Sequence, residues 1–136
     1  WQVLLQPLNY PEIDKLLKKS EKLKTDIIPI LESINGLANL EEICSFLERI
    51  QIISFGSHDL AKSINLKISQ DEKEILEFRK NIVNKSKNIK SPIDTSYLNF
   101  KDLNGFEKSC NFVKKLGFGG KACIHPDQVQ ISNKIF

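Results

Sequence analysis

The fold of this chain is decided by the stretch Leu116-Gly117-Phe118-Gly119-Gly120-Lys121-Ala122-Cys123-Ile124-His125-Pro126-Asp127-Gln128. Its glycines indicate the end of a helix, because glycine readily adopts the positive φ that a helix C-terminus needs. Residues 121–124 then predict a short buried strand, and Pro126 suits the first turn of another helix. The stretch therefore predicts a helix, a strand and a helix in direct succession, as in an α/β protein.

Apolar runs alternate with helical patterns along the rest of the chain. The runs are continuous rather than strictly alternating, as parallel strands buried on both faces require. They predict strands at 3–8, 26–32, 50–55 and 91–95. Helices are predicted where apolar side chains recur at helical spacing or a helix start signal occurs. These helices lie at 13–23, 39–47, 59–64 and 104–117, and one more begins after residue 72.

Two helix starts carry a capping pattern. Asn39 is followed within three residues by glutamate, and Ser69 by Glu72, which is the spacing of a capping box. The second box predicts a long helix that turns four apolar side chains inward: Ile75, Leu76, Phe78 and Ile82.

The stretch 116–128 resembles the last strand of the HpcH/HpaI aldolase and citrate lyase family, which includes citrate lyase beta subunits and malyl-CoA lyases. That family usually shows Gly-Phe, then Gly-Lys, then Ile-His-Pro-x-Gln. This chain has Gly117-Phe118, Gly120-Lys121 and Ile124-His125-Pro126-Asp127-Gln128. The resemblance implies an α/β fold, the (β/α)8 barrel, of which this chain holds roughly strands four to eight.

The length agrees with part of a barrel. A chain of 136 residues can bury one core, but a (β/α)8 barrel typically needs about 250 residues. The sequence starts at Trp1 and contains no methionine. We therefore expect residues 1–136 to be the C-terminal part of a single barrel domain in a longer protein.

The resemblance implies a metal site made by two carboxylates on successive strands. Glu32 ends one apolar run, and Asp59 ends the next, 27 residues later. That spacing is about one strand-helix-strand unit, so both acids would lie at the C-terminal ends of neighbouring strands. Two such carboxylates make a hard-oxygen site that suits Mg²⁺. The alternative is that each acid caps a helix or faces solvent.

The turn Gly56-Ser57-His58 joins the second strand to its helix and is a candidate substrate site. Gly56 allows a ligand close to the backbone, Ser57 can cap, and amides at a helix start attract a carboxylate. The alternative is an ordinary strand-to-helix turn, with His58 as an exposed loop residue.

Asp94 and His125 complete the predicted substrate-binding residues. His125 follows the last strand, and the resemblance places it at the catalytic mouth, although it could instead hydrogen-bond the turn before Pro126. Asp94 ends another strand, where it could bind substrate or cap the turn towards Tyr97. Cys123 shares a strand face with His125, but a buried structural thiol is the commoner role for such a cysteine. The sequence identifies no catalytic acid or base.

The chain departs from the family in one segment. Gln6-Pro7-Leu8-Asn9 stands where the family usually has Pro-Lys-Val-Glu. The family's substrate-binding arginine lies on a strand that this sequence does not contain. Arg49 follows the helix predicted at 39–47, and Arg79 falls within the helix predicted after residue 72, so neither is expected to replace it.

Composition limits the other classes of function. The net charge is +3, and lysines crowd two helices, as on a solvated face or near a phosphate-bearing partner. The basic residues lack an aromatic platform, which argues against nucleic acid as a partner. Three cysteines without metal-ligand spacing are typical of reduced thiols in a cytoplasmic protein. Neither a signal peptide nor a membrane segment is indicated.

These observations lead to one expected activity and two alternatives. The expected activity is a Mg²⁺-dependent carbon–carbon lyase acting on a citryl-, malyl- or citramalyl-type thioester of coenzyme A or a carrier protein, in a homo-oligomer. The first alternative is a metal-dependent aldolase of pyruvate-type substrates from the same superfamily. The second, kept open by Gln6-Pro7-Leu8-Asn9, is a degenerate binding or assembly subunit.

Overall fold

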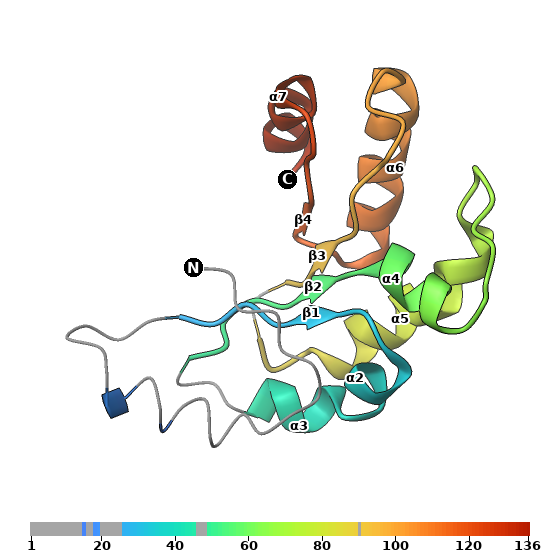
Figure 1. Cartoon of the computed structure of the whole chain (residues 1–136). Coiled ribbons are helices and arrows are strands. Elements are labelled where there is room, and N and C mark those ends of the chain that lie inside the picture. Colours follow the sequence, from blue (N-terminus) through green and yellow to red (C-terminus); the bar gives the residue numbers. More distant parts are fainter. Residues whose placement is uncertain (1–14, 16–17, 20–25, 46–48, 90) are drawn as a thin grey trace.

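Four parallel strands form the sheet, in the order in which they occur along the chain (Figure 1). The computed structural model describes residues 15, 18, 19, 26–45, 49–89 and 91–136. Within them the strands are β1 (Ile30–Leu31), β2 (Ser54–Phe55), β3 (Ile93–Asp94) and β4 (Gly120–Lys121). The predicted parallel α/β class is confirmed, and each described strand is shorter than the apolar run that predicted it.

Helices follow each strand. They are α2 (Ile34–Ala38), α3 (Leu40–Ser45), α4 (Ser57–Ser63), the 3₁₀ turn η1 (Lys73–Ile75), α5 (Leu76–Lys85), α6 (Leu103–Leu116) and α7 (Pro126–Ile135). Helices α6 and α7 pack side by side next to β4 (Figure 1). Because every neighbouring strand pair is parallel and consecutive, the carboxyl ends of the strands share one edge of the sheet.

The strand register divides the sheet residues between two faces. Leu31 is paired with Phe55, and Asp94 with Lys121. Since Ser54 is paired with Ile93, Phe55 aligns with Asp94, and the four residues form one row across the sheet. Side chains alternate between the faces of a strand, so Glu32 and Gly56 belong to the opposite face. We call the first face helix-facing and the second barrel-facing.

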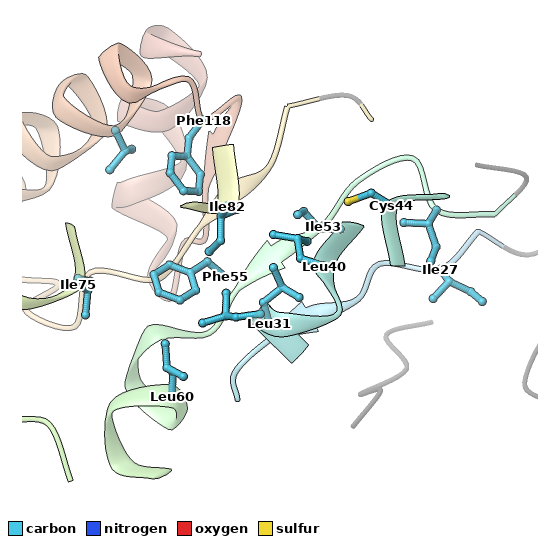
Figure 2. Packing of buried hydrophobic residues seen from close by; sticks show 13 residues of the cluster. Ile27, Leu31, Leu40, Cys44, Ile53, Phe55, Leu60, Ile75, Ile82 and Phe118 are labelled. Carbon is cyan, nitrogen blue, oxygen red and sulfur yellow. The ribbon is translucent and has the colours of Figure 1, made fainter. Parts of the chain in front are cut away.

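The core fills the space between the helix-facing row and the helices. Leu31 and Phe55, exposed by 1% and 2%, belong to one buried cluster with side chains of α3, α4 and α5 (Figure 2). Burying each such side chain contributes roughly 1.5–3 kcal/mol. Two of the four predicted inward residues, Ile75 and Ile82, are fully buried, while Leu76 and Phe78 are half-buried.

The turn signals of the 116–128 stretch are confirmed. Gly117 ends α6 with φ 112°, in the left-handed region that glycine tolerates. His125 is the N-cap of α7, and Pro126 is its first residue. The signals at the other end of α6 are confirmed only approximately, since this helix begins at Leu103 behind an Asp102 N-cap.

The two predicted capping boxes have different outcomes. Asn39 directly precedes α3, as predicted, and its carbonyl accepts from the Ile43 amide over 2.9 Å. It also ends α2, a short helix that the sequence did not predict.

The Ser69 hydroxyl donates to Glu74, 2.7 Å away, instead of pairing with Glu72. Glu72 adopts a left-handed backbone with φ 52° and ion-pairs with Arg79. The capping pattern failed because the Ser69 hydroxyl donates to Asp71 and Glu74 instead of pairing with Glu72.

Several sequence predictions lie outside the described residues. These are the strand at 3–8 with its Gln6–Asn9 segment, most of the helix at 13–23, and the end of the helix at 39–47. Lys15, Lys18 and Lys19 are described and helical, in agreement with that prediction. Over the described part of the chain, no helix combines the length and apolar character needed to cross a bilayer.

Candidate active site

Glu32 and Gly56 are in close contact at the carboxyl ends of β1 and β2. The Gly56 amide donates to the Leu31 carbonyl over 2.9 Å, which locks the two strand ends together. A Cβ atom added to Gly56 would lie 2.9 Å from the Glu32 Cβ and 3.4 Å from its Oε2. A side chain at position 56 would therefore displace the Glu32 carboxylate, and glycine is what allows this acid to sit there.

Asp59 lies in the first turn of α4, three residues after Gly56, and is exposed. Within the described residues, neither the Glu32 nor the Asp59 carboxylate has a hydrogen-bond or ion-pair partner. The carboxylate oxygens of the half-buried Glu32 are therefore available to bind a ligand. The two acids follow neighbouring strands at one edge, as predicted, and the close approach of their carboxylates stays a prediction.

The donor set at this edge fits a hard divalent cation. Two uncommitted carboxylates match Mg²⁺, which binds through one or two carboxylates and retains water or substrate oxygens in its other positions. The described residues contain no cluster of three or more His, Cys, Asp or Glu side chains suited to a metal. Any further protein ligand would have to come from elsewhere in the protein.

Ser57, directly after Gly56, has a buried hydroxyl without a hydrogen-bond partner among the described residues. The residue is fully buried, and its Oγ has no hydrogen-bond partner in the structure described. The first helical hydrogen bond of α4 runs from the Leu60 amide to the Gly56 carbonyl, so the amides before Leu60 lie outside the helical ladder. A hydroxyl and backbone amides are therefore both placed at the turn where the sequence predicted a substrate carboxylate.

His58 and His125 belong to different parts of this edge. The half-buried His58 has its Nε2 atom 3.3 Å from the Ser96 carbonyl, in the segment that follows β3. The His125 Nδ1 accepts from the Asp127 amide at 3.3 Å, and its ring stacks on Phe100 with centroids 5.0 Å apart. The alternative offered by the sequence was a hydrogen bond to the turn before Pro126, whereas the observed bond caps α7 through Asp127, after Pro126. The role of His125 in substrate binding stays a prediction.

Asp94 is separated from the other predicted site residues. It lies on the helix-facing side, is fully buried, and accepts hydrogen bonds from Arg79 and Lys121. Among the described residues, Asp94 does not make the alternative cap of the turn towards Tyr97, because its carboxylate accepts from the Arg79 and Lys121 side chains instead. These buried ion pairs give the Asp94 carboxylate a role in the structure, and its contact with substrate stays a prediction.

Sequence reasoning missed Thr95 and the partners of Asp94. Thr95 follows Asp94, so strand alternation turns it to the barrel-facing side, in line with Gly56, and it is buried. Like Glu32 and Gly56, Thr95 is the residue directly after a strand, and this shared position would have identified it.

Arg79 did carry a signal, because it lies four residues after Ile75 and three before Ile82, on the helix face predicted to point inward. That spacing did not identify its partner, Asp94.

The fold and the site together define a segment of a parallel α/β barrel with a paired-carboxylate edge. A sequence model of the HpcH/HpaI aldolase/citrate lyase family matches residues 8–126. The chain therefore belongs to this family, and the resemblance seen in residues 116–128 is confirmed.

Curated relatives carry lyase names. The mitochondrial citramalyl-CoA lyase of Rattus norvegicus is 30% identical over 129 residues, covering 87% of this chain and 38% of that protein. The citrate lyase subunit beta of Leuconostoc mesenteroides subsp. cremoris is 26% identical over 132 residues, covering 92% of this chain and 44% of the relative. The chain thus spans less than half the length of these relatives.

Solved structures support the fold. RipC from Yersinia pestis superposes with a TM-score of 0.81 at 24% identity, over 97% of this chain and 61% of that one. The citrate lyase beta subunit of M. tuberculosis, complexed with oxaloacetate and magnesium, gives 0.75 at 16% identity, over 98% and 70%. These similarities identify the (β/α)8 barrel type, of which the chain holds consecutive strands.

Proposed function

We propose that the complete protein is a Mg²⁺-dependent carbon–carbon lyase that cleaves or forms a 3-hydroxyacyl thioester of coenzyme A or a carrier protein. The observation that carries the proposal is the Glu32 carboxylate, packed against Gly56 and without a partner in the described structure. Family membership and the names of the relatives, citramalyl-CoA lyase and citrate lyase subunit beta, support the substrate class.

Each residue of this edge has a distinct task in the proposal. Glu32 and Asp59 hold the cation from two neighbouring strand ends. A bound Mg²⁺ supplies Lewis-acid polarisation of a substrate oxygen. Gly56 keeps the space beside Glu32 open, so that the substrate can approach the backbone. The Ser57 hydroxyl and the amides at the start of α4 orient a substrate carboxylate, because these donors have no acceptor in the helix.

The M. tuberculosis subunit was crystallised with oxaloacetate and magnesium, and its fold superposes on this chain. That complex is consistent with a divalent cation and a keto acid at the corresponding edge here. We extend the proposal to a single barrel domain containing residues 1–136 and to a homo-oligomer in the cytoplasm, as expected from the sequence.

The test uses the full-length protein and a panel of citryl-, malyl- and citramalyl-thioesters. Turnover is measured while Mg²⁺ is titrated, for wild type, Asp59→Asn and His58→Ala. Asp59→Asn keeps the size of the side chain but removes one negative charge from the metal, so it should abolish metal-dependent turnover with little effect on the fold. His58→Ala should cost far less than Asp59→Asn, because the imidazole is not a proposed metal ligand and the Asp59 carboxylate is still present.

Three outcomes would change the proposal. Equal turnover of Asp59→Asn and wild type at limiting Mg²⁺ would show that the metal is placed wrongly. A full-length protein that binds Mg²⁺ but turns over none of the thioesters would favour the degenerate binding subunit. Turnover of free pyruvate-type substrates alone would favour the aldolase alternative.

A further inference from the structure

Three buried charged side chains and the partly exposed Glu72 form a network between the sheet and α5. The Asp94 carboxylate accepts from Arg79 through Nε at 2.9 Å and Nη2 at 3.0 Å, and from the Lys121 Nζ at 2.5 Å. The three side chains are exposed by no more than 1%. Arg79 Nη2 also donates to Glu72 over 2.7 Å. Burial lowers the pKa of the Arg79 guanidinium, but the Asp94 and Glu72 carboxylates together outweigh this effect, so the pKa is raised.

The need for a stable core does not explain this network. The same helix-facing row contains Leu31 and Phe55, so apolar side chains fill equivalent positions on β1 and β2. Well-packed apolar groups that replace a buried ion pair often leave stability unchanged or improve it. A bidentate guanidinium–carboxylate pair instead provides fixed geometry. Glu72, the outer partner, holds a left-handed backbone that is unfavourable for a residue with a side chain.

The network holds the first residue of the segment 94–96, which runs from the end of β3 towards the candidate metal site. Asp94 is the last residue of β3, and two residues later the Ser96 carbonyl lies 3.3 Å from the His58 Nε2. His58 directly precedes Asp59 in the first turn of α4. On the other side, the buried Gln128 amide donates to the Tyr97 carbonyl at 3.0 Å. A continuous set of contacts therefore runs from Arg79 through Asp94 and Ser96 to His58.

We propose that Arg79 is a positioning residue for Asp59. Its two hydrogen bonds to the Asp94 carboxylate fix the position of the backbone from residue 94 to residue 96. The Ser96 carbonyl then orients the His58 side chain and, with it, the first turn of α4. This inference rests on the proposed role of Asp59 as a metal ligand. Its prediction is that the affinity for a divalent cation depends on Arg79, a fully buried side chain on the opposite face of the sheet from Glu32.

The decisive measurement is direct binding of Mn²⁺, followed by electron paramagnetic resonance on the full-length protein without substrate. Arg79→Lys keeps the charge but loses the bidentate geometry, and should weaken Mn²⁺ binding about ten- to a hundredfold, as supporting partners of metal ligands commonly do. Lys80→Met, on the exposed side of α5, is the matched control and should bind like wild type. Thermal unfolding of every variant is recorded in parallel.

Two further variants separate positioning from folding. In the combined Arg79→Met, Asp94→Leu and Lys121→Met variant, the charges are replaced by apolar groups. It should unfold near the wild-type temperature yet lose Mn²⁺ affinity to the same extent as Arg79→Lys. If Arg79 acts through His58, then Arg79→Lys should have little further effect in a His58→Ala background, as a double-mutant cycle would show.

The possible failures are distinguishable. If wild type binds Mn²⁺ and Asp59→Asn does not, the proposed metal site stands. Wild-type Mn²⁺ affinity in a folded Arg79→Lys variant then overturns the positioning role alone, whether or not the triple variant folds. If Asp59→Asn leaves Mn²⁺ binding unchanged, the proposed function fails, and the inference about Arg79 fails with it.

Discussion

Glu32 and Asp94 both lie at the carboxyl edge of one parallel sheet, yet their carboxylates are on opposite faces. Glu32 packs against Gly56 on the barrel-facing side, whereas Asp94 is bound by Arg79 on the helix-facing side. Within the described structure, the Glu32 carboxylate has no hydrogen-bond or ion-pair partner, whereas the Asp94 carboxylate is bound by the buried side chains of Arg79 and Lys121. Their different tasks follow from strand alternation, since Glu32 follows Leu31 of the helix-facing row and Asp94 belongs to that row.

Gly56→Ala should disable the metal site while leaving the fold in place. The added Cβ would approach the Glu32 Cβ to 2.9 Å, so the carboxylate has to move. We expect the affinity for Mg²⁺ or Mn²⁺ to fall about ten- to a hundredfold, the range typical of disturbed support around metal ligands. Titration calorimetry with Mn²⁺ on the full-length protein would measure this loss.

Gly120→Ala provides the matched control, because Gly120 lies on the same face two strands away. Its added Cβ would meet the Ile93 Cγ1 at 3.6 Å, an ordinary van der Waals distance. Metal affinity should therefore stay at the wild-type value. An equal loss in both variants would mean that the sheet, and not the space beside Glu32, is what the substitutions disturb.

Ser57→Ala should separate a binding role from a folding role. The Ser57 hydroxyl is buried without a partner in the described structure, and leaving such a group unsatisfied costs about 1–3 kcal/mol. The free energy of unfolding should therefore stay constant or increase by about 1 kcal/mol. If the hydroxyl binds substrate, KM should rise several-fold. Steady-state kinetics and urea denaturation measure the two effects.

Ser86→Ala is the comparison for that experiment. Ser86 follows the end of α5, and its hydroxyl is also buried and unpartnered in the part of the chain that is described. Its replacement should have the same small effect on stability and no effect on KM. A KM change of similar size in both variants would remove the argument that Ser57 contacts substrate.

Acid should weaken the start of α6 through Asp102. The hydrogen bond from the Gly105 amide, followed by that from the Tyr97 hydroxyl, lowers the pKa of the Asp102 carboxyl below its usual value. The stabilisation is therefore complete above the unfolded pKa of about 3.9 and is lost as the pH falls through the lower folded pKa. In denaturation measured from pH 7 to pH 2, the stability difference between wild type and Asp102→Asn should shrink with acid. A constant difference would contradict this assignment.

The three cysteines should differ in reactivity. Burial raises the pKa of the Cys44 and Cys110 thiols to about 11, whereas Cys123 is only half-buried. Iodoacetamide at pH 8, with peptide mass spectrometry as the readout, should label Cys123 well before the other two, because the thiolate is the reacting form. Labelling of Cys110 at the rate of Cys123 would show that the helix pair α6–α7 opens readily.

The sequence predicted the order of elements well because helix ends are set locally. Gly117 and Pro126 fix the ends of α6 and α7 through their own backbone restrictions, independently of distant neighbours. The edge with Glu32, Gly56 and Asp59 was predictable for a related reason, since parallel strands bring their carboxyl ends together. Strand lengths were less predictable, because an apolar run also includes buried residues outside the hydrogen-bonded ladder, such as Ile27 and Ile50.

The environments of Asp94 and Glu72 could not be predicted in this way. The Asp94 carboxylate is paired with Arg79 of α5 and Lys121 of β4, and these residues contact it only in the folded structure. Glu72 fitted a local capping rule, yet its carboxylate binds Arg79 while Glu74 takes the serine. A local capping rule fails where an ion pair outside the capping pattern competes for the same side chain.

The buried network also limits how this protein can be recombined with its relatives. A chimera with a crossover between 86 and 92 would take Arg79 from one parent and Asp94 from the other. Unless the second parent carries the same pair, the graft would leave a buried charge without its counter-ion, which is strongly destabilising. A crossover between 64 and 68 inherits Glu72, Arg79, Asp94 and Lys121 as one block, and is therefore the natural boundary for exchanging halves of this fold.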